Sequence, residues 1–341
     1  MFYLAVFIAV MPSLACGYVT AKRILYQSSL KCGQVNEHSS IFIFGLGYVG
    51  LSIASKLRYM GCKVSGTCTN INKMKSLREL GINAYLFNDF YGEGKLTEND
   101  ARNDLLTSSH IITTIAPTLS SNGDPVLKGH GIDLREVSLN TNNCNSKLKW
   151  LGYISSTGVY GDRGGEWVHE TDKLNPESMK SKMRLQAEMA WRSLYQRNDL
   201  PVHIFRVAGI YGPGRNALDT LLKAEGDMNQ CGPDNITYIS RIHLSDLTNV
   251  IIASMNNPSP GLILNVADDM PSTRFDVLVY SCHLMNYPSQ KEKPDKKGEP
   301  YSSRGGSKRV DNSKMKLLLK SANIELLYPD YKSGLSAIHM L

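Results

Sequence analysis

Beyond residue 40, short apolar runs alternate with stretches in which apolar residues recur at helical spacing. The apolar runs predict seven strands, at residues 41–44, 63–67, 84–87, 110–115, 151–155, 202–207 and 262–266. Helical spacing is clearest at residues 51–60 and 74–80. Strands that alternate with helices are typical of a parallel sheet covered on both faces. The pattern therefore predicts an α/β fold with a doubly wound parallel sheet.

Two stretches break this alternation and predict a second, smaller unit. We assign residues 39–211 and 241–268 to the domain that contains the sheet. Residues 212–240 and 269–341 then form a small C-terminal substrate lobe over the carboxyl edge of the sheet. Within the lobe, residues 287–308 are rich in Pro, Lys, Gly and Ser and predict a loop.

The first 38 residues differ in composition from the rest. Residues 2–11 are almost all apolar, small residues follow, and no acidic residue occurs before Glu37. This pattern resembles a two-part plastid presequence, a signal peptide followed by a transit peptide. The apolar run is short for a membrane span, so we expect a mature protein that does not cross the membrane. Two alternatives stay open: a cytoplasmic protein, or a membrane anchor through residues 2–15.

Composition narrows the class of protein only a little. The 341 residues are 42% hydrophobic and 20% charged, with a formal net charge of +7. This is ordinary for a globular protein, and because the basic residues are scattered we expect no nucleic-acid partner. The seven cysteines contain no Cys-x-x-Cys pair, and the histidines show no ligand spacing. We therefore expect reduced thiols and no metal site.

A glycine-rich motif follows the first predicted strand and opens the first predicted helix. It reads Gly-x-Gly-x-x-Gly, a pattern that in this context predicts a dinucleotide-binding Rossmann domain. The first glycine permits a tight turn, the second admits a diphosphate close to the backbone, and the third lets helix and strand pack closely. Amides at the helix start then bind the anion. The predicted loop comprises Gly45, Leu46, Gly47, Tyr48, Val49 and Gly50.

The end of the second strand bears on the choice of cofactor. An NAD site usually has an acidic residue there to bind the ribose 2′-hydroxyl, and here no acid occurs before Glu79. Its absence removes a charge that would repel a 2′-phosphate. Thr67, Thr69 and Lys73 are candidates to hold that phosphate, so NADP is favoured and NAD stays open. Asp89, after the third strand, is a candidate contact for the adenine or a helix cap.

Several later segments resemble the extended short-chain dehydrogenases/reductases of the NAD-dependent epimerase/dehydratase type. They are Tyr-Ile-Ser-Ser-Thr-Gly-Val-Tyr-Gly-Asp from residue 153, Phe-Arg-Val-Ala-Gly-Ile-Tyr-Gly-Pro-Gly from 205, Arg-Ile-His-Leu-Ser-Asp from 241 and Leu-Asn-Val from 264. Their order and spacing agree with that family across about residues 40–320. The resemblance implies a nicotinamide cofactor and a small-molecule substrate.

In that family a Ser and a Tyr-x-x-x-Lys motif carry proton transfer, with Glu usually four residues after the Lys. The resemblance places Ser156 in the serine position and, with Glu188 as the marker, Arg184 in the lysine position and Lys180 in the tyrosine position. No Tyr lies between Gly161 and Tyr195. The absence of the proton-transfer Tyr marks an atypical member, similar to the bacterial YeeZ-like subgroup and its plant plastid relatives. Ser156, Lys180 and Arg184 are the candidate catalytic residues.

Further residues fall at the ends of the predicted strands. Thr114, Ala116 and Pro117 end the fourth strand, where we expect the nicotinamide side of the cofactor. Arg215 and Arg241 are candidates to bind an anionic substrate, with a surface position as the open alternative. For Arg206 and His243 we expect structural roles, a charge pair and a core histidine.

Two functions fit these observations. One is an NAD(P)-dependent oxidoreductase or epimerase that transfers hydride to or from a small carbonyl or sugar-nucleotide substrate held near Ser156. The other is a non-catalytic NADP-binding redox sensor or assembly factor, which the missing Tyr favours. An RNA-associated role is weaker, because no aromatic and basic surface is apparent. A homodimer is compatible with either function.

Overall fold

The computed structural model describes residues 35–87, 95–96, 98–118, 123–139, 148–223, 237–287 and 306–341. Most of the expected presequence, Asp89 and most of the expected loop at 287–308 lie outside these residues. Plastid targeting therefore stays a prediction. No helix in the described ranges is long and apolar enough to cross a membrane.

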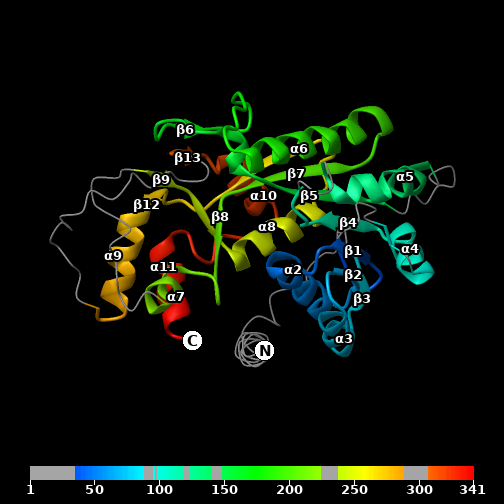
Figure 1. Ribbon diagram of the computed structural model, residues 1–341, viewed down its shortest axis with the longest axis horizontal. Coiled ribbons are helices and arrows are strands. Elements are labelled where there is room, and N and C mark those ends of the chain that lie inside the picture. The colour runs from blue at the N-terminus through cyan, green and yellow to red at the C-terminus, as the bar shows by residue number, and fades with distance from the viewer. Residues whose placement is uncertain are drawn as a thin grey trace.

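Seven strands form one sheet in the order β11-β7-β5-β4-β1-β2-β3, and every adjacent pair is parallel. In chain order the strands are β1 (Ser40–Phe44), β2 (Lys63–Cys68), β3 (Asn83–Leu86), β4 (His110–Thr113), β5 (Trp150–Ser156), β7 (Val202–Val207) and β11 (Ile263–Val266). All seven strands expected from the apolar runs are present. The prediction of a doubly wound Rossmann-type sheet is confirmed (Figure 1).

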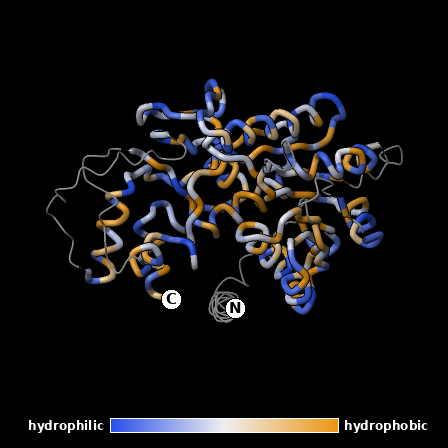
Figure 2. The backbone as a smooth tube through the Cα atoms, viewed as in Figure 1, coloured by the Kyte–Doolittle hydropathy of each residue, from blue (hydrophilic) through white to orange (hydrophobic). Residues whose placement is uncertain are grey.

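Helices cover both faces of the sheet, and β1 shows how the sequence divides between them. Ile41 and Ile43 belong to the core under α2 (Tyr48–Tyr59), α3 (Ile71–Glu79) and α8 (Leu244–Asn256). Phe42 and Phe44 belong to the opposite core, under α4 (Asn99–Leu106), α5 (Pro125–Leu139) and α6 (Met179–Asn198). Successive side chains of a strand point to opposite faces, so a strand buried on both faces is apolar throughout. Figure 2 shows hydrophobic positions concentrated along these strands.

Three helices pack together away from the sheet: α7 (Ala217–Lys223), α9 (Arg274–Leu284) and α11 (Tyr331–His339). They share small apolar cores that include Leu218, Val277 and Leu335 (Figure 1). Short ladders join this region to the rest: β8 (Gly209–Tyr211) pairs with β10 (Arg241–His243), and β9 (Tyr238–Ile239) with β12 (Ser272–Thr273). A further short ladder pairs β6 (Trp167–Val168) with β13 (Arg309–Val310).

Helix α10 (Ser313–Ser321) lies apart from those three helices, although the predicted boundaries include it in the lobe. It packs on α8 and β11, and its Met315 and Leu319 belong to the core of the sheet. By its packing, α10 thus belongs to the core of the sheet and not to the three-helix region. The domain boundaries otherwise stay a prediction.

Candidate functional site

The glycine loop joins β1 to α2 at the carboxyl edge of the sheet. Gly45 has φ +91°, in the left-handed region, and a Cβ there would lie 2.8 Å from both Ile115 and Thr114. A Cβ on Gly50 would collide with the carbonyl oxygen of Gly45, whereas a Cβ on Gly47 would meet nothing within 4 Å. The turn and the close packing are thus fixed, and open space lies at Gly47, where a diphosphate would approach.

Two threonines hold this loop from beneath. Thr67 Oγ1 accepts a hydrogen bond from the Gly45 amide at 2.8 Å, and Thr114 Oγ1 donates to the Gly45 carbonyl at 2.7 Å. Thr67 is fully buried. The sequence predicts that Thr67 contacts a 2′-phosphate. Because the side chain is buried, this contact is not available in this structure. Thr67 positions the loop instead.

The residues just after β2 are arranged differently. Thr69 is exposed, and Asn70 caps α3 by accepting a hydrogen bond from the Lys73 amide at 2.8 Å. The first turn of α3 contains no acid, so no carboxylate faces this end of β2 from that turn. Thr69 and Lys73 thus remain the candidates for contact with an adenosine ribose or its phosphate.

Ser156 ends β5 and begins the short 3-10 helix η2 (Thr157–Tyr160). Its Oγ accepts a hydrogen bond from the Gly158 amide at 3.1 Å, which fixes the side chain at the carboxyl edge of the sheet. A hydroxyl that accepts one bond can still donate one. This leaves Ser156 able to donate to a substrate oxygen. Beyond β4 at the same edge, Ala116 is exposed and Pro117 is half-buried.

The first turns of α6 carry the other two candidate catalytic residues. Arg184 is half-buried and donates from Nη1 to the Ile154 carbonyl at 2.9 Å and to the Tyr153 hydroxyl at 3.3 Å. Lys180 is exposed. Hydrogen bonds thus hold the Arg184 guanidinium against β5, whereas the Lys180 side chain is exposed to solvent.

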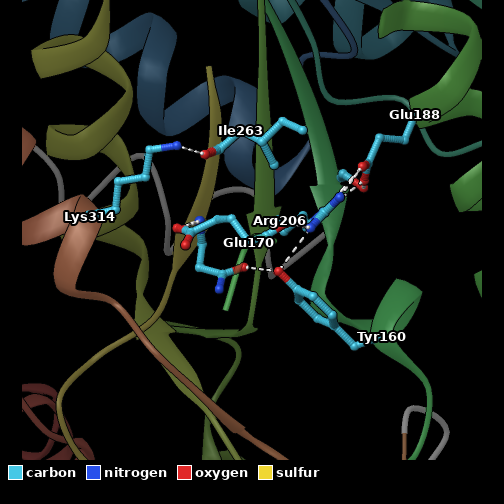
Figure 3. Close-up of polar contacts among 8 residues, drawn as sticks. Tyr160, Glu170, Glu188, Arg206, Ile263 and Lys314 are labelled. Carbon is cyan, nitrogen blue, oxygen red and sulfur yellow. Dashed lines mark hydrogen bonds and ion pairs between the residues drawn. The ribbon is translucent and has the colours of Figure 1, made fainter. Parts of the chain in front are cut away.

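A buried polar network lies behind these residues and ties α6 to the sheet (Figure 3). Glu188, one helical turn after Arg184, is fully buried and forms an ion pair with Arg206 at 2.7 Å. Glu188 also accepts a hydrogen bond from Ser155 at 2.8 Å. Arg206 further donates to the hydroxyl of Tyr160 at 3.0 Å, and burial raises the pKa of Tyr160 to about 12. The structural role expected of Arg206 agrees with this geometry, and Tyr160 belongs to the same network.

The two candidate substrate arginines lie in different places. Arg215 is exposed, and its guanidinium lies 5.7 Å from the ring centroid of Tyr48, in the glycine loop. Arg241 is half-buried and donates from Nη1 to the carbonyls of Ile239 and Ser272, at 2.8 and 2.9 Å. Arg241 therefore braces the small ladders, and its contact with a substrate stays a prediction.

One acidic residue was not foreseen from the sequence. Asp268 lies just beyond β11 and is buried, and its Oδ2 has no hydrogen-bond partner among the described residues. Burial raises the pKa of Asp268 to about 8, and the nearby Arg241 partly opposes this rise. No spacing in the sequence distinguishes it from the adjacent Asp269, which pairs with Lys316 at 3.0 Å. His243 is buried, as expected, and caps α8 through Nδ1.

Two known proteins are similar to this chain over much of its length. A conserved protein of unknown function from Silicibacter pomeroyi DSS is 31% identical, with a TM-score of 0.69, over 89% of this chain and 99% of that one. Protein YeeZ of Escherichia coli K12 is 27% identical over 227 residues, 66% of this chain and 76% of YeeZ. No protein-family model matches the chain.

A third protein shares the fold at lower identity. The structure of dTDP-glucose 4,6-dehydratase from Bacillus anthracis in complex with NAD has a TM-score of 0.69 and 19% identity, over 89% of this chain and 96% of that one. At 31% identity over 89% of this chain, the chain belongs to the same family as the Silicibacter pomeroyi protein, and it shares the fold of the dehydratase.

Proposed function

We propose that this chain binds NADP(H) at the glycine loop and transfers hydride to or from a small carbonyl or sugar-nucleotide substrate. The observation that carries the proposal is the loop itself. Gly45 makes the turn, Gly50 packs against it, and Gly47 leaves open space beside the start of α2. Amides of a first helical turn have no acceptor within the helix, so they are available to an anion. The dehydratase of similar fold binds NAD, which supports a nicotinamide cofactor.

The preference for NADP over NAD rests on the residues after β2. Thr69 is exposed, Lys73 lies one turn further on, and no acid is present in the first turn of α3. A cation and a hydroxyl attract a 2′-phosphate, whereas the carboxylate of an NAD site would repel it.

Ser156 and Arg184 would act beside the nicotinamide, which supplies the hydride chemistry when bound. Ser156 would donate a hydrogen bond to the substrate oxygen. Arg184 would provide a permanent positive charge close to β5, which stabilises negative charge but does not readily release a proton. Lys180 occupies the position of the missing Tyr and, because it is exposed, is the weakest of the three candidates.

A non-catalytic role in sensing the redox state of the cofactor is the second candidate. It is favoured by the exposure of Lys180 and by the absence of any Tyr between Gly161 and Tyr195. Such a protein would keep the loop and the buried network but would need no proton donor.

One experiment separates the two functions. The purified chain is titrated with NADPH and with NADH, and absorbance of the reduced nicotinamide is then followed over a panel of sugar nucleotides and small carbonyls. We expect saturable binding, tighter for NADPH, and oxidation with at least one substrate. Binding without turnover across the panel would favour the sensor, and no binding of either nucleotide would contradict the proposal.

A further inference from the structure

A tight turn after β8 carries Arg215 to the glycine loop. Gly212 and Arg215 exchange two backbone hydrogen bonds, each 3.0 Å long. Asn216 donates from Nδ2 to the Gly212 carbonyl at 3.1 Å. These bonds fix the backbone that presents Arg215, although the side chain itself is exposed.

The same turn contacts the first residue of α2. The hydroxyl of Tyr48 donates to the Pro213 carbonyl at 3.1 Å, and the guanidinium of Arg215 lies 5.7 Å from the Tyr48 ring centroid. A Cβ on Gly212 would lie 2.7 Å from the Tyr48 hydroxyl, so the approach of the two segments depends on a glycine there. A guanidinium over a tyrosine ring is held in place without losing its hydrogen-bond donors.

Charge distinguishes this contact from an ordinary surface arginine. Residues 45–51, the loop and the first turn of α2, contain no basic side chain. A dinucleotide diphosphate bound there carries negative charge that the loop would meet with amides alone. Asp219, the acid near Tyr48, accepts a hydrogen bond from Asn216 at 2.7 Å. Arg215 therefore brings a positive charge to a loop that has none of its own.

We propose that Arg215 is a ligand of the cofactor diphosphate, provided by the segment that leads into α7, and not a substrate-binding residue. The inference rests on the proposed dinucleotide binding at the glycine loop. An arginine fork matches phosphate oxygens with two donors, and such charge-assisted bonds are among the stronger ones. Cofactor binding would then join the sheet domain to the α7 segment through a single side chain.

The test uses ADP-ribose, which contains the diphosphate but no nicotinamide, and adenosine, which has no phosphate. Affinities are measured by calorimetry for the full chain, Arg215→Ala, Arg215→Lys and the matched control Arg197→Ala. Arg197 is exposed in the last turn of α6, at the amino edge of the sheet. We expect Arg215→Ala to weaken ADP-ribose binding by roughly tenfold or more and adenosine binding by less than about twofold. Arg215→Lys should recover part of the loss, and Arg197→Ala should bind both probes as the wild type does.

Each other outcome overturns the inference in a recognisable way. If Arg215→Ala binds ADP-ribose within about twofold of the wild type, Arg215 is not a diphosphate ligand, while the proposed function stands. If adenosine and ADP-ribose weaken equally, Arg215 acts through the fold of the loop and not on the diphosphate. If the wild-type chain binds neither the probes nor NADPH, the proposed function fails together with the inference. Circular dichroism of each variant, recorded first, shows whether the fold is retained.

Discussion

The two sides of the carboxyl edge differ in how they are built. At β1 and α2 the proposed site consists mostly of backbone, the glycines and amides of the loop, with two threonine hydroxyls bonded to Gly45. At β5 and α6 it depends on side chains, and there the usual Tyr is absent while Arg184 binds a main-chain carbonyl. The buried Glu188–Arg206 pair nevertheless holds α6 against the sheet. The fold thus keeps the packing of α6 on the sheet although the Tyr of the resembled family is absent, and cofactor binding would not by itself imply catalysis.

The largest effect is expected in the buried network. Arg206→Met leaves Glu188 fully buried without its ion-pair partner, which should lower the free energy of unfolding by ~3–5 kcal/mol. Denaturant unfolding measures the change. The double variant Arg206→Met/Glu188→Leu removes both charges and should recover much of the loss. A single variant as stable as the wild type would show that this network does not stabilise the α6 side.

Ser156→Ala tests whether the part of the proposed site at β5 and α6 is catalytic. On any substrate found in the panel, we expect turnover to fall by roughly a hundredfold while the dissociation constant of NADPH stays unchanged, since Ser156 is proposed to contact the substrate oxygen. Stopped-flow oxidation of NADPH measures the first quantity and calorimetry the second. Unchanged turnover would remove Ser156 from the site.

The cofactor preference can be reversed at the end of β2. Thr69→Asp places a carboxylate where the 2′-phosphate of NADP would lie, and it should shift the ratio of NADPH to NADH affinity by roughly tenfold toward NADH. Lys73→Ala should weaken the binding of NADPH but not that of NADH. Equal weakening of both nucleotides by either variant would contradict the assignment of the 2′-phosphate to these residues.

The smallest effect is expected at Lys180. Because its side chain is exposed, Lys180→Met should change turnover by less than about threefold at any pH between 6 and 9. The pH profile of turnover is the measurement. A loss approaching a hundredfold would instead identify Lys180 as the proton donor that replaces the Tyr.

The part of the proposed site at β1 and α2 could be predicted from the sequence, whereas the part at β5 and α6 could be predicted only in part. Apolar runs predict all seven strands, and Gly45, Gly47 and Gly50 are recognisable by spacing, because both signals are local in the chain. Whether Thr67 lies under the loop or faces a ligand depends on how β2 sits beside β1. The direction of Arg184 and the contact between Tyr48 and Arg215 likewise arise only when segments distant in the sequence pack together.

The central claim is that the glycine loop binds a nicotinamide dinucleotide, and Gly47→Asp tests it most directly. The new side chain would enter the open space at Gly47 and place a carboxylate beside the diphosphate, where like charges cost several kcal/mol. NADPH titrations of the wild type and the variant are compared, after thermal unfolding has shown that the two proteins are equally stable. The account predicts saturable binding by the wild type and affinity weakened by about a hundredfold or more in Gly47→Asp. Equal affinity of the two proteins for NADPH would contradict it.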